Sequence, residues 1–237
     1  LNADLNVAEG SQDMTLNGVI KGEGKIIKSG SAALQLNQSN HYSGGTVLNK
    51  GTVRLSNAKA LGSGGLVVTG SATLDTVPHL VLDTPIELKA DLDITGRYLT
   101  LNSIISGSGG IIKSSSAPLR LNAANRYNGG TTLYDGKLLL GHPMALGQGA
   151  LMIKGAAILD NQLELALNNR IELQDDLNVM GIENLTLNAV ISGTKGLTKY
   201  GQAALTLNAA NTYQGIPLCM TVLWLSAREP VWPQLTE

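Results

Sequence analysis

Few residues of this chain combine a reactive side chain with the spacing that catalysis would need. The histidines are His41, His79 and His142. Each lies at a predicted turn or at a position that varies between copies of an internal repeat, where His41 is replaced by Arg126 and then by Thr212. A histidine that acts as a general acid or base needs a fixed geometry, so we interpret all three as solvated loop residues.

Motifs for nucleophiles and for phosphate binding are also missing from the sequence. No serine stands in a G-x-S-x-G element, and the single cysteine, Cys219, excludes an internal disulfide. The turn Gly22-Glu23-Gly24 has neither the third glycine nor the following helix of a phosphate-binding loop. The sequence therefore predicts no catalytic residue and no cofactor.

The acidic residues are the strongest candidates for chemistry. Asp91 and Asp93 alternate on one face of a predicted strand, and the pair Asp175-Asp176 lies near the equivalent place in the next copy. Paired carboxylates can bind Ca²⁺ or share a proton. The same D-L-[ND] pattern recurs at 4–6 and 176–178, so we interpret it as a turn or solvent-facing strand and predict no metal site. Weak cation binding is the first alternative, and catalysis the second.

The composition limits the class of protein that holds these residues. The 237 residues have a formal net charge of −1, 15% charged residues, 3% aromatic residues and no Phe. No basic footprint for nucleic acid is present, so no nucleic-acid partner is predicted. No apolar run reaches the roughly 18 residues of a membrane span. The chain begins at Leu1 without a signal-peptide pattern, and we expect an excised or mature segment.

A long internal repeat organises the chain. Residues 40–75 and 125–160 align without a gap at an offset of 85, and 17 of 36 positions are identical. A third copy follows at an offset of 86. We place the copies in a repeat region at 1–215, with boundaries at about 4–90, 91–175 and 176–215, the last copy being incomplete.

A shorter period runs inside each copy. Variants of Leu-x-Leu-Asn place their last apolar residue at positions 16, 36, 55 and 74, and the series resumes at 101 after a longer step. Alternating apolar residues predict short strands, and the Gly, Asn, Asp and Ser between them predict turns. Strands that return after roughly 19–20 residues stack as a parallel β-solenoid. We expect four coils per copy, the fourth one lengthened.

A solenoid also accounts for the composition. Its narrow interior would be filled by Leu, Ile, Val and Ala, and we expect it to exclude bulky aromatic rings. Glycine supplies corners that need a positive φ. Asparagines that follow the last inward leucine can stack as hydrogen-bonded ladders; they are Asn17, Asn37, Asn102, Asn122, Asn188 and Asn208.

One tyrosine recurs in the N-x-Y-x-G element of each copy, as Tyr42, Tyr127 and Tyr213. An outward tyrosine could stack on a sugar or bind a protein. The ring could equally pack over a corner while the asparagine caps the turn, and we favour this structural role.

The last residues, 216–237, break the repeat in mid-motif. They contain the only Cys and both Trp. We interpret this atypical tail as frameshifted or non-native, with a capping element as the alternative.

The repeated motif resembles the passenger-associated strand repeat of bacterial autotransporters, most like the AIDA-type adhesins. N-x-Y-x-G-G-T is preceded by G-x-G with a lysine four residues later and followed by A-L-G-x-G. The motif residues are Asn40, Tyr42, Gly44, Gly45 and Thr46 in the first copy, and Asn125, Tyr127, Gly129, Gly130 and Thr131 in the second. The resemblance covers 1–215 and implies a right-handed parallel β-helix displayed at the bacterial cell surface or outer membrane, or secreted.

The resemblance also implies adhesion, autoaggregation or biofilm formation. The partners would be a host-cell surface or the same protein on neighbouring bacteria, with a translocator β-barrel in the full-length precursor. A Gly-Asp-Ser-Gly protease signature is missing, so a serine-protease branch is not supported. Two alternatives stay open, a passive β-helical stalk and a carbohydrate-active β-helix enzyme.

Overall fold

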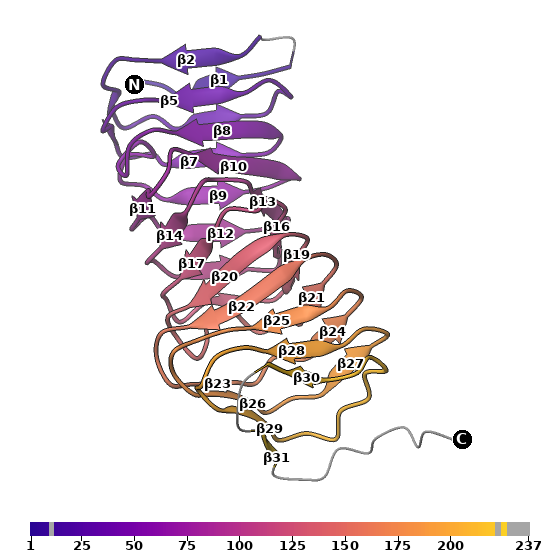
Figure 1. Cartoon of the computed structure of the whole chain (residues 1–237). Helices are drawn as coiled ribbons and strands as arrows, with labels where there is room; N and C mark the ends of the chain where they lie inside the picture. The colour runs from indigo at the N-terminus through magenta and orange to yellow at the C-terminus, as the bar shows by residue number, and fades with distance from the viewer. Residues whose placement is uncertain (10–11, 221–223, 227–237) are drawn as a thin grey trace.

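The chain forms a parallel β-solenoid of about 11 turns, which confirms the predicted fold class. The structure is a computed structural model that describes residues 1–9, 12–220 and 224–226. Short strands are stacked along a rod, with the N-terminal coil at one end (Figure 1). Among the described residues no helix is long and apolar enough to cross a lipid bilayer.

Each coil passes over three faces of the rod. The first face is a seven-stranded sheet, and a four-stranded sheet takes the same place in the later coils. The second face is one ten-stranded sheet. The third face begins as a two-stranded sheet and continues as an eight-stranded sheet. Equivalent strands of successive coils pair in parallel, so that Leu5 lies beside Ile26 on the first face and Leu34 beside Val53 on the second.

The first face contains β1 (Leu5–Val7), β4 (Ile26–Lys28), β7 (Thr46–Leu48), β9 (Leu66–Val68), β12 (Ile86–Leu88), β15 (Ile105–Gly107) and β18 (Arg126–Tyr127), then β23 (Leu165–Leu167), β26 (Leu185–Leu187), β29 (Leu205–Leu207) and β31 (Trp224–Ser226). The second face contains β2 (Met14–Leu16), β5 (Leu34–Leu36), β8 (Gly51–Leu55), β10 (Ala72–Thr76), β13 (Leu92–Ile94), β16 (Ile111–Lys113), β19 (Thr131–Leu133), β21 (Leu151–Ile153), β24 (Ile171–Leu173) and β27 (Ile191–Gly193). The third face contains β3 (Lys21–Gly22) and β6 (His41–Tyr42), then β11 (Val81–Leu82), β14 (Leu99–Leu101), β17 (Leu119–Leu121), β20 (Gly136–Leu140), β22 (Ala157–Asn161), β25 (Leu177–Val179), β28 (Leu197–Lys199) and β30 (Leu218–Cys219).

The core is a continuous column of aliphatic side chains inside the coils. In most three-residue strands the outer two residues are buried and the middle one faces outward, as in β5, where Leu34 and Leu36 are 0% exposed. The expectation that the interior excludes aromatic rings was wrong. Tyr42 and Tyr127 are the largest fully buried side chains, because small residues of the next coil make room for each ring.

The long repeat does not consist of four coils with a lengthened fourth, and that prediction was wrong. Four coils lead from Ile26 through Thr46, Leu66 and Ile86 to Ile105 on the first face. The repeat partner of Ile26 is instead Ile111, which lies one face further on, in β16. One copy therefore spans four coils and one extra face, and each copy is turned by about a third of a turn relative to the one before it.

The long interval in the Leu-x-Leu pattern has the same origin. Leu74 ends its apolar pair on β10 of the second face, whereas the next marker, Leu101, lies on β14 of the third face. The coils on this stretch keep their usual length, because Leu74 pairs with Ile94 and Leu82 pairs with Leu101. The step from position 74 to position 101 is therefore one coil plus one face.

Part of the atypical tail continues the stack. β30 pairs with β28, and β31 pairs with β29. Residues 221–223 and 227–237 lie outside the described residues. The proposed change of reading frame in 216–237 stays a prediction, which the coding DNA can test.

Candidate functional site

The repeated motif occupies a corner of the solenoid, between β6 and β7 in the first copy and between β18 and β19 in the second. Its asparagine is buried and joins three successive coils. Asn40 accepts a hydrogen bond from the Ile20 amide at 2.9 Å and donates to the Ala60 carbonyl at 2.7 Å. The asparagine thereby satisfies backbone groups of the coils on either side, which would otherwise be buried without partners.

The second copy repeats this arrangement on a different face. Asn125 accepts from the Ile105 amide at 2.9 Å and donates to the Ala145 carbonyl at 2.7 Å. In the third copy Asn211 accepts from the Ile191 amide at 2.8 Å. The motif asparagine is therefore a clamp between coils.

The motif tyrosine lies under the clamp. The hydroxyls of Tyr42 and Thr46 are 2.6 Å apart, and those of Tyr127 and Thr131 are at the same distance. Burial raises the pKa of Tyr42 to about 12, although its hydrogen bond to Thr46 opposes the shift. Burial raises the pKa of Tyr127 in the same way. Because Tyr42 and Tyr127 are 0% exposed, these two rings are closed to a sugar in solution.

Glycines of the following A-L-G-x-G segment cover the ring. A Cβ on Gly147 would lie 2.5 Å from the Tyr127 carbonyl oxygen and 3.0 Å from its ring, and Gly147 also has a φ of +63°. Gly62 stands over Tyr42 in the same way, with a φ of +69°. The glycine-glycine pair of the motif, Gly44 and Gly45 in the first copy, approaches neighbouring backbone as closely: a Cβ on Gly44 would lie 2.6 Å from the Gly24 carbonyl carbon. The two parts of the motif are thus successive coils that pack on each other.

A buried lysine lies at the N-terminal end of the motif, before the asparagine and the tyrosine. Lys28, Lys113 and Lys199 end equivalent strands, and each is at most 2% exposed. The Lys113 ammonium donates to the Ser115 carbonyl, to the Ser115 hydroxyl at 3.2 Å and to the Asp135 carbonyl at 3.3 Å. Burial lowers the pKa of Lys113 to about 8, while Asp135 and Asp93 oppose this shift. Burial lowers the pKa of Lys28 and Lys199 as well.

Asparagine ladders run along the outside of the corners, as predicted. Asn122 donates to Asn102 at 2.8 Å, and Asn102 donates to Asp83 at 3.0 Å. A second ladder joins Asn17 and Asn37 at 2.6 Å. The last ladder consists of Asn168, Asn188 and Asn208, with distances of 2.9 and 2.8 Å.

Known proteins share this motif. The passenger-associated-transport-repeat family matches residues 26–55, 111–140 and 197–216. Each of these ranges contains the buried lysine, the motif asparagine and the motif tyrosine. A relative named Adhesin BmaC autotransporter, from Brucella suis biovar 1 (strain 1330), is 31% identical over 132 residues.

The chain is similar to autotransporter passenger repeats. The matched region covers 53% of this chain but only 4% of the relative, so the chain spans a small part of that adhesin. No solved structure matches it.

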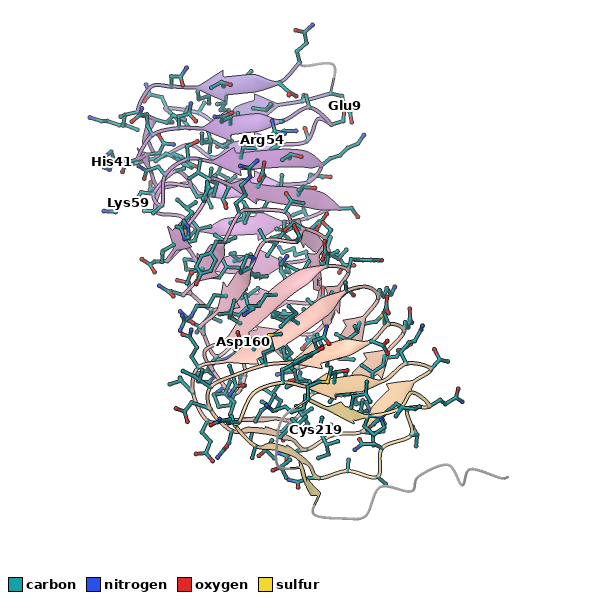
Figure 2. The ribbon with its side chains drawn as sticks, in the orientation of Figure 1. Glu9, His41, Arg54, Lys59, Asp160 and Cys219 are labelled. Carbon is teal, nitrogen blue, oxygen red and sulfur yellow. The ribbon has the colours of Figure 1, made fainter. Side chains whose placement is uncertain are left out.

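The histidines of the chain lie apart, in different coils. His41 is exposed on β6, on the edge of the rod that also holds Lys59 (Figure 2). His142 accepts a hydrogen bond from the Met144 amide at 3.0 Å within its own turn. His79 is exposed and has a φ of 60°. The structure therefore brings no two histidines together.

Asp91, Asp93 and Asp176 bind backbone and hydroxyl donors of the next coil. Asp91 accepts from the Gly110 amide at 2.7 Å, and Asp93 accepts from the Ser114 hydroxyl at 2.7 and 2.9 Å. Asp176 accepts from the Gly196 amide at 2.7 Å, while Asp175 accepts from the Asp176 amide at 2.8 Å. Within residues 1–9, 12–220 and 224–226, no three His, Cys, Asp or Glu side chains converge as metal ligands. Each carboxylate is thus engaged in holding a turn.

The burial of the motif lysines was not predicted, although the sequence contains a signal for it. Lys28 follows Ile26 by two residues, and alternation in a strand places residues two apart on one face. Gly51 adds a second signal: it has a φ of +79°, and a Cβ there would lie 2.7 Å from the Lys28 ammonium.

Replacing Asn125 by alanine is expected to lower the free energy of unfolding by about 2 kcal/mol, because a buried amide and a buried carbonyl lose their partner. The matched control is Asn122→Ala in the same coil, which breaks a half-exposed ladder contact and should cost less than about 1 kcal/mol. Chemical denaturation followed by circular dichroism measures both. Equal losses for the two variants would contradict the role of Asn125 as a clamp.

Proposed function

We propose that the chain is a rod segment of a surface-displayed or secreted passenger that acts in bacterial adhesion, autoaggregation or biofilm formation. The observation that carries this proposal is the passenger repeat itself, built into a parallel solenoid and shared with a protein named as an adhesin autotransporter. Most three-residue strands turn their middle residue outward along the rod. Many weak contacts on such a surface add up when numerous copies meet.

We also propose a location and binding partners for the protein. An autotransporter passenger is carried by a translocator β-barrel, so the full-length precursor should contain one and place this segment at the bacterial cell surface or outer membrane, or release it. The binding partner is a host-cell surface or the same protein on a neighbouring bacterium. A non-enzymatic role is supported by the way the aspartates are engaged in turns.

Surface display tests this function. Residues 1–237 should be fused to a translocator barrel on a non-aggregating bacterium, and settling and attachment to epithelial cells should be measured. Faster settling or more attachment than with an unrelated passenger of equal length is expected. Mixing displaying cells with differently labelled cells that lack the chain separates the two partners, because self-association excludes the bare cells from the clumps.

Two results would contradict the proposal. Unchanged settling together with unchanged attachment would leave a passive stalk. Release of sugar from a polysaccharide by the purified chain would instead favour the carbohydrate-active enzyme.

A further inference from the structure

One pocket lies on the surface where the first repeat copy meets the second, at the corner that follows β10. Its volume is about 210 Å³, and its wall includes Arg54 from β8, Asp75 and Thr76 from β10, and Arg97 after β13. The pocket therefore spans three successive coils. Its position is separate from the motif corners described above.

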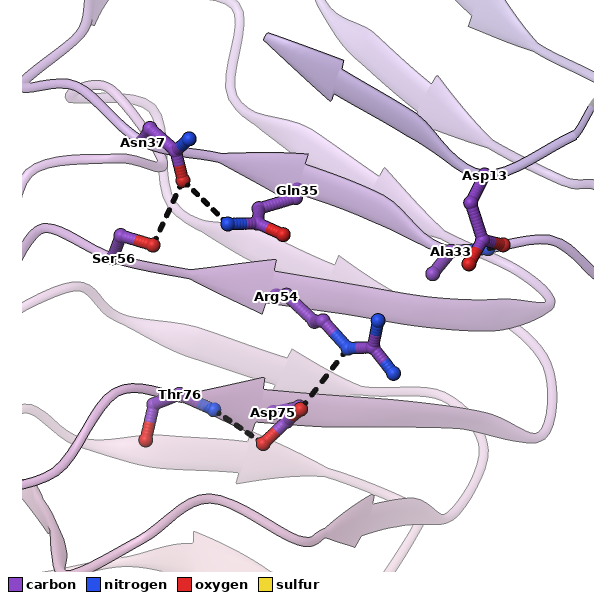
Figure 3. Close-up of polar contacts among 8 residues, drawn as sticks. All are labelled: Asp13, Ala33, Gln35, Asn37, Arg54, Ser56, Asp75 and Thr76. Carbon is purple, nitrogen blue, oxygen red and sulfur yellow. Dashed lines mark hydrogen bonds and ion pairs between the residues drawn. The ribbon is translucent and has the colours of Figure 1, made fainter. Parts of the chain in front are cut away.

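Two guanidinium groups give this pocket a positive character. Arg54 donates from Nε to Asp75 at 3.1 Å, and the terminal nitrogens of its guanidinium extend away from that carboxylate (Figure 3). Asp75 also accepts the Thr76 amide at 2.8 Å. Arg97 is exposed, and its side chain has no polar partner among the described residues. Asp75 neutralises one of the two arginines, so the wall of the pocket carries a net positive charge.

A buried hydroxyl completes the wall. Thr76 is 5% exposed, and its Oγ1 is one of two buried side-chain atoms of the described residues that lack a hydrogen-bond partner. A Cβ on Gly96 would lie 2.3 Å from this oxygen, so the glycine packs directly against it. An unpartnered buried hydroxyl costs free energy.

Two aromatic rings flank the pocket. His79 and Tyr98 follow the wall residues Pro78 and Arg97, and their ring centroids are 4.8 Å apart. Their φ values of 60° and 54° make them the non-glycine residues with positive φ in the described part of the chain. Such strained backbone conformations cost of order 1–3 kcal/mol each and concentrate at binding sites.

The equivalent positions 85 residues further along the chain show that the fold does not require these features. At an offset of 85, Leu139 and Ile182 stand in place of Arg54 and Arg97, and Glu183 stands in place of Tyr98. The second copy nevertheless builds the same coils, because β22 and β25 pair as β10 and β13 do. The unpartnered oxygen does recur, as Asn161 Oδ1. The arginine pair and the aromatic pair are thus additions to one copy.

We propose that this pocket binds one carboxylated sugar residue, such as a uronic or sialic acid, of a surface glycan. A guanidinium fork matches the geometry of a carboxylate, and the hydroxyl of Ser56 and the amide of Gln35, which also line the pocket, suit sugar hydroxyls. The volume admits a single sugar ring. This inference rests on the proposed adhesive function for its biological meaning, and it adds the ligand class.

Titration of the purified full chain tests the pocket directly. Glucuronic acid and N-acetylneuraminic acid are the probes, with glucose as the neutral comparison and inorganic sulfate as the free anion. Ligand-observed NMR is suited to the weak, roughly millimolar affinity expected of one sugar residue. The acidic sugars should bind at least tenfold more tightly than glucose and than sulfate.

Arg97→Gln should weaken binding of the acidic sugars at least tenfold without changing the unfolding curve, because the Arg97 side chain makes no polar contact with the described residues. Arg126→Gln removes an exposed arginine from β18, outside the pocket, and should leave binding unchanged. Arg97→Lys keeps the charge but not the fork, and should recover only part of the affinity.

Equal binding of glucuronic acid and glucose would overturn the proposal, as would equal effects of the two glutamine variants. Sulfate bound as tightly as the acidic sugars would reduce the site to an anion site and would also overturn it. Because these titrations use purified protein, their failure is distinguishable from a failure of surface display to cause adhesion.

Discussion

Replacement of Tyr127 by alanine is expected to lower the free energy of unfolding by about 3–5 kcal/mol, the usual cost of removing a large buried ring. The ring is 0% exposed and lies beneath the Gly147 backbone of the next coil. That coil cannot collapse into the space, since its own strands are fixed by pairing on both sides. The cavity therefore stays open, and relaxation of the neighbouring coil does not reduce the loss of stability.

Two variants separate the ring from its hydroxyl and from exposure. Tyr127→Phe keeps the volume and loses the 2.6 Å contact with Thr131, and it should cost about 1 kcal/mol. Tyr134→Ala removes a tyrosine that is 45% exposed and should change stability by less than about 1 kcal/mol. Denaturant unfolding of the three proteins gives the comparison. A loss for Tyr127→Ala as small as that for Tyr134→Ala would show that the ring does not support the stack.

The second large effect is on pH dependence. Between about pH 8 and pH 10.5, the unfolded lysine at position 113 holds a proton that the folded one has lost, since burial lowers its pKa from 10.5 to about 8. Stability rises with pH wherever the unfolded state binds more protons. At about 1.4 kcal/mol per unit of pKa shift, the rise reaches on the order of 2–3 kcal/mol by pH 10.

Tyr42 reverses the trend at higher pH. Its pKa rises from 10.0 to about 12 on burial, so the folded state keeps a proton that the unfolded state loses between these values. Stability then falls with pH. The free energy of unfolding should therefore pass through a maximum near pH 10.

Urea denaturation at a series of pH values between 7 and 12 checks this behaviour. Lys113→Met should flatten the rise, whereas Lys59→Met, at an exposed position, should leave it intact. A stability that is constant or falls from pH 8 to pH 10 in the unaltered chain would refute the role assigned to the buried ammonium.

Alternation and turn residues were enough to predict the stack, because each strand buries its first and third residues. The pairs Leu34 and Leu36, or Leu119 and Leu121, show this directly. The asparagine ladders were also predictable, since Asn102 and Asn122 follow inward leucines one coil apart. Local pattern and fold agree at these positions.

The rotation between copies was not predictable from the same pattern. Strands on all three faces carry Leu-x-Leu, so Leu74 and Leu101 look like successive markers of one face although they lie on two. Only the pairing register distinguishes a longer coil from a step to the next face. The pocket escaped notice for a related reason: Arg54 and Arg97 are far apart in sequence and absent from the second copy.

Because of the extra face, equivalent features of successive copies follow a helical path around the rod. Coils are about 4.8 Å apart. A feature that every copy carries is therefore shifted by about 21 Å along the rod axis from one copy to the next, and it points in a new direction each time. It returns to the same side only after three copies, about 60 Å along the axis. A flat partner can then touch every third copy at most, whereas partners that arrive from all sides find equivalent surfaces at staggered heights. Rods of this kind are suited to cross-linking in three dimensions rather than to pairing along a single seam.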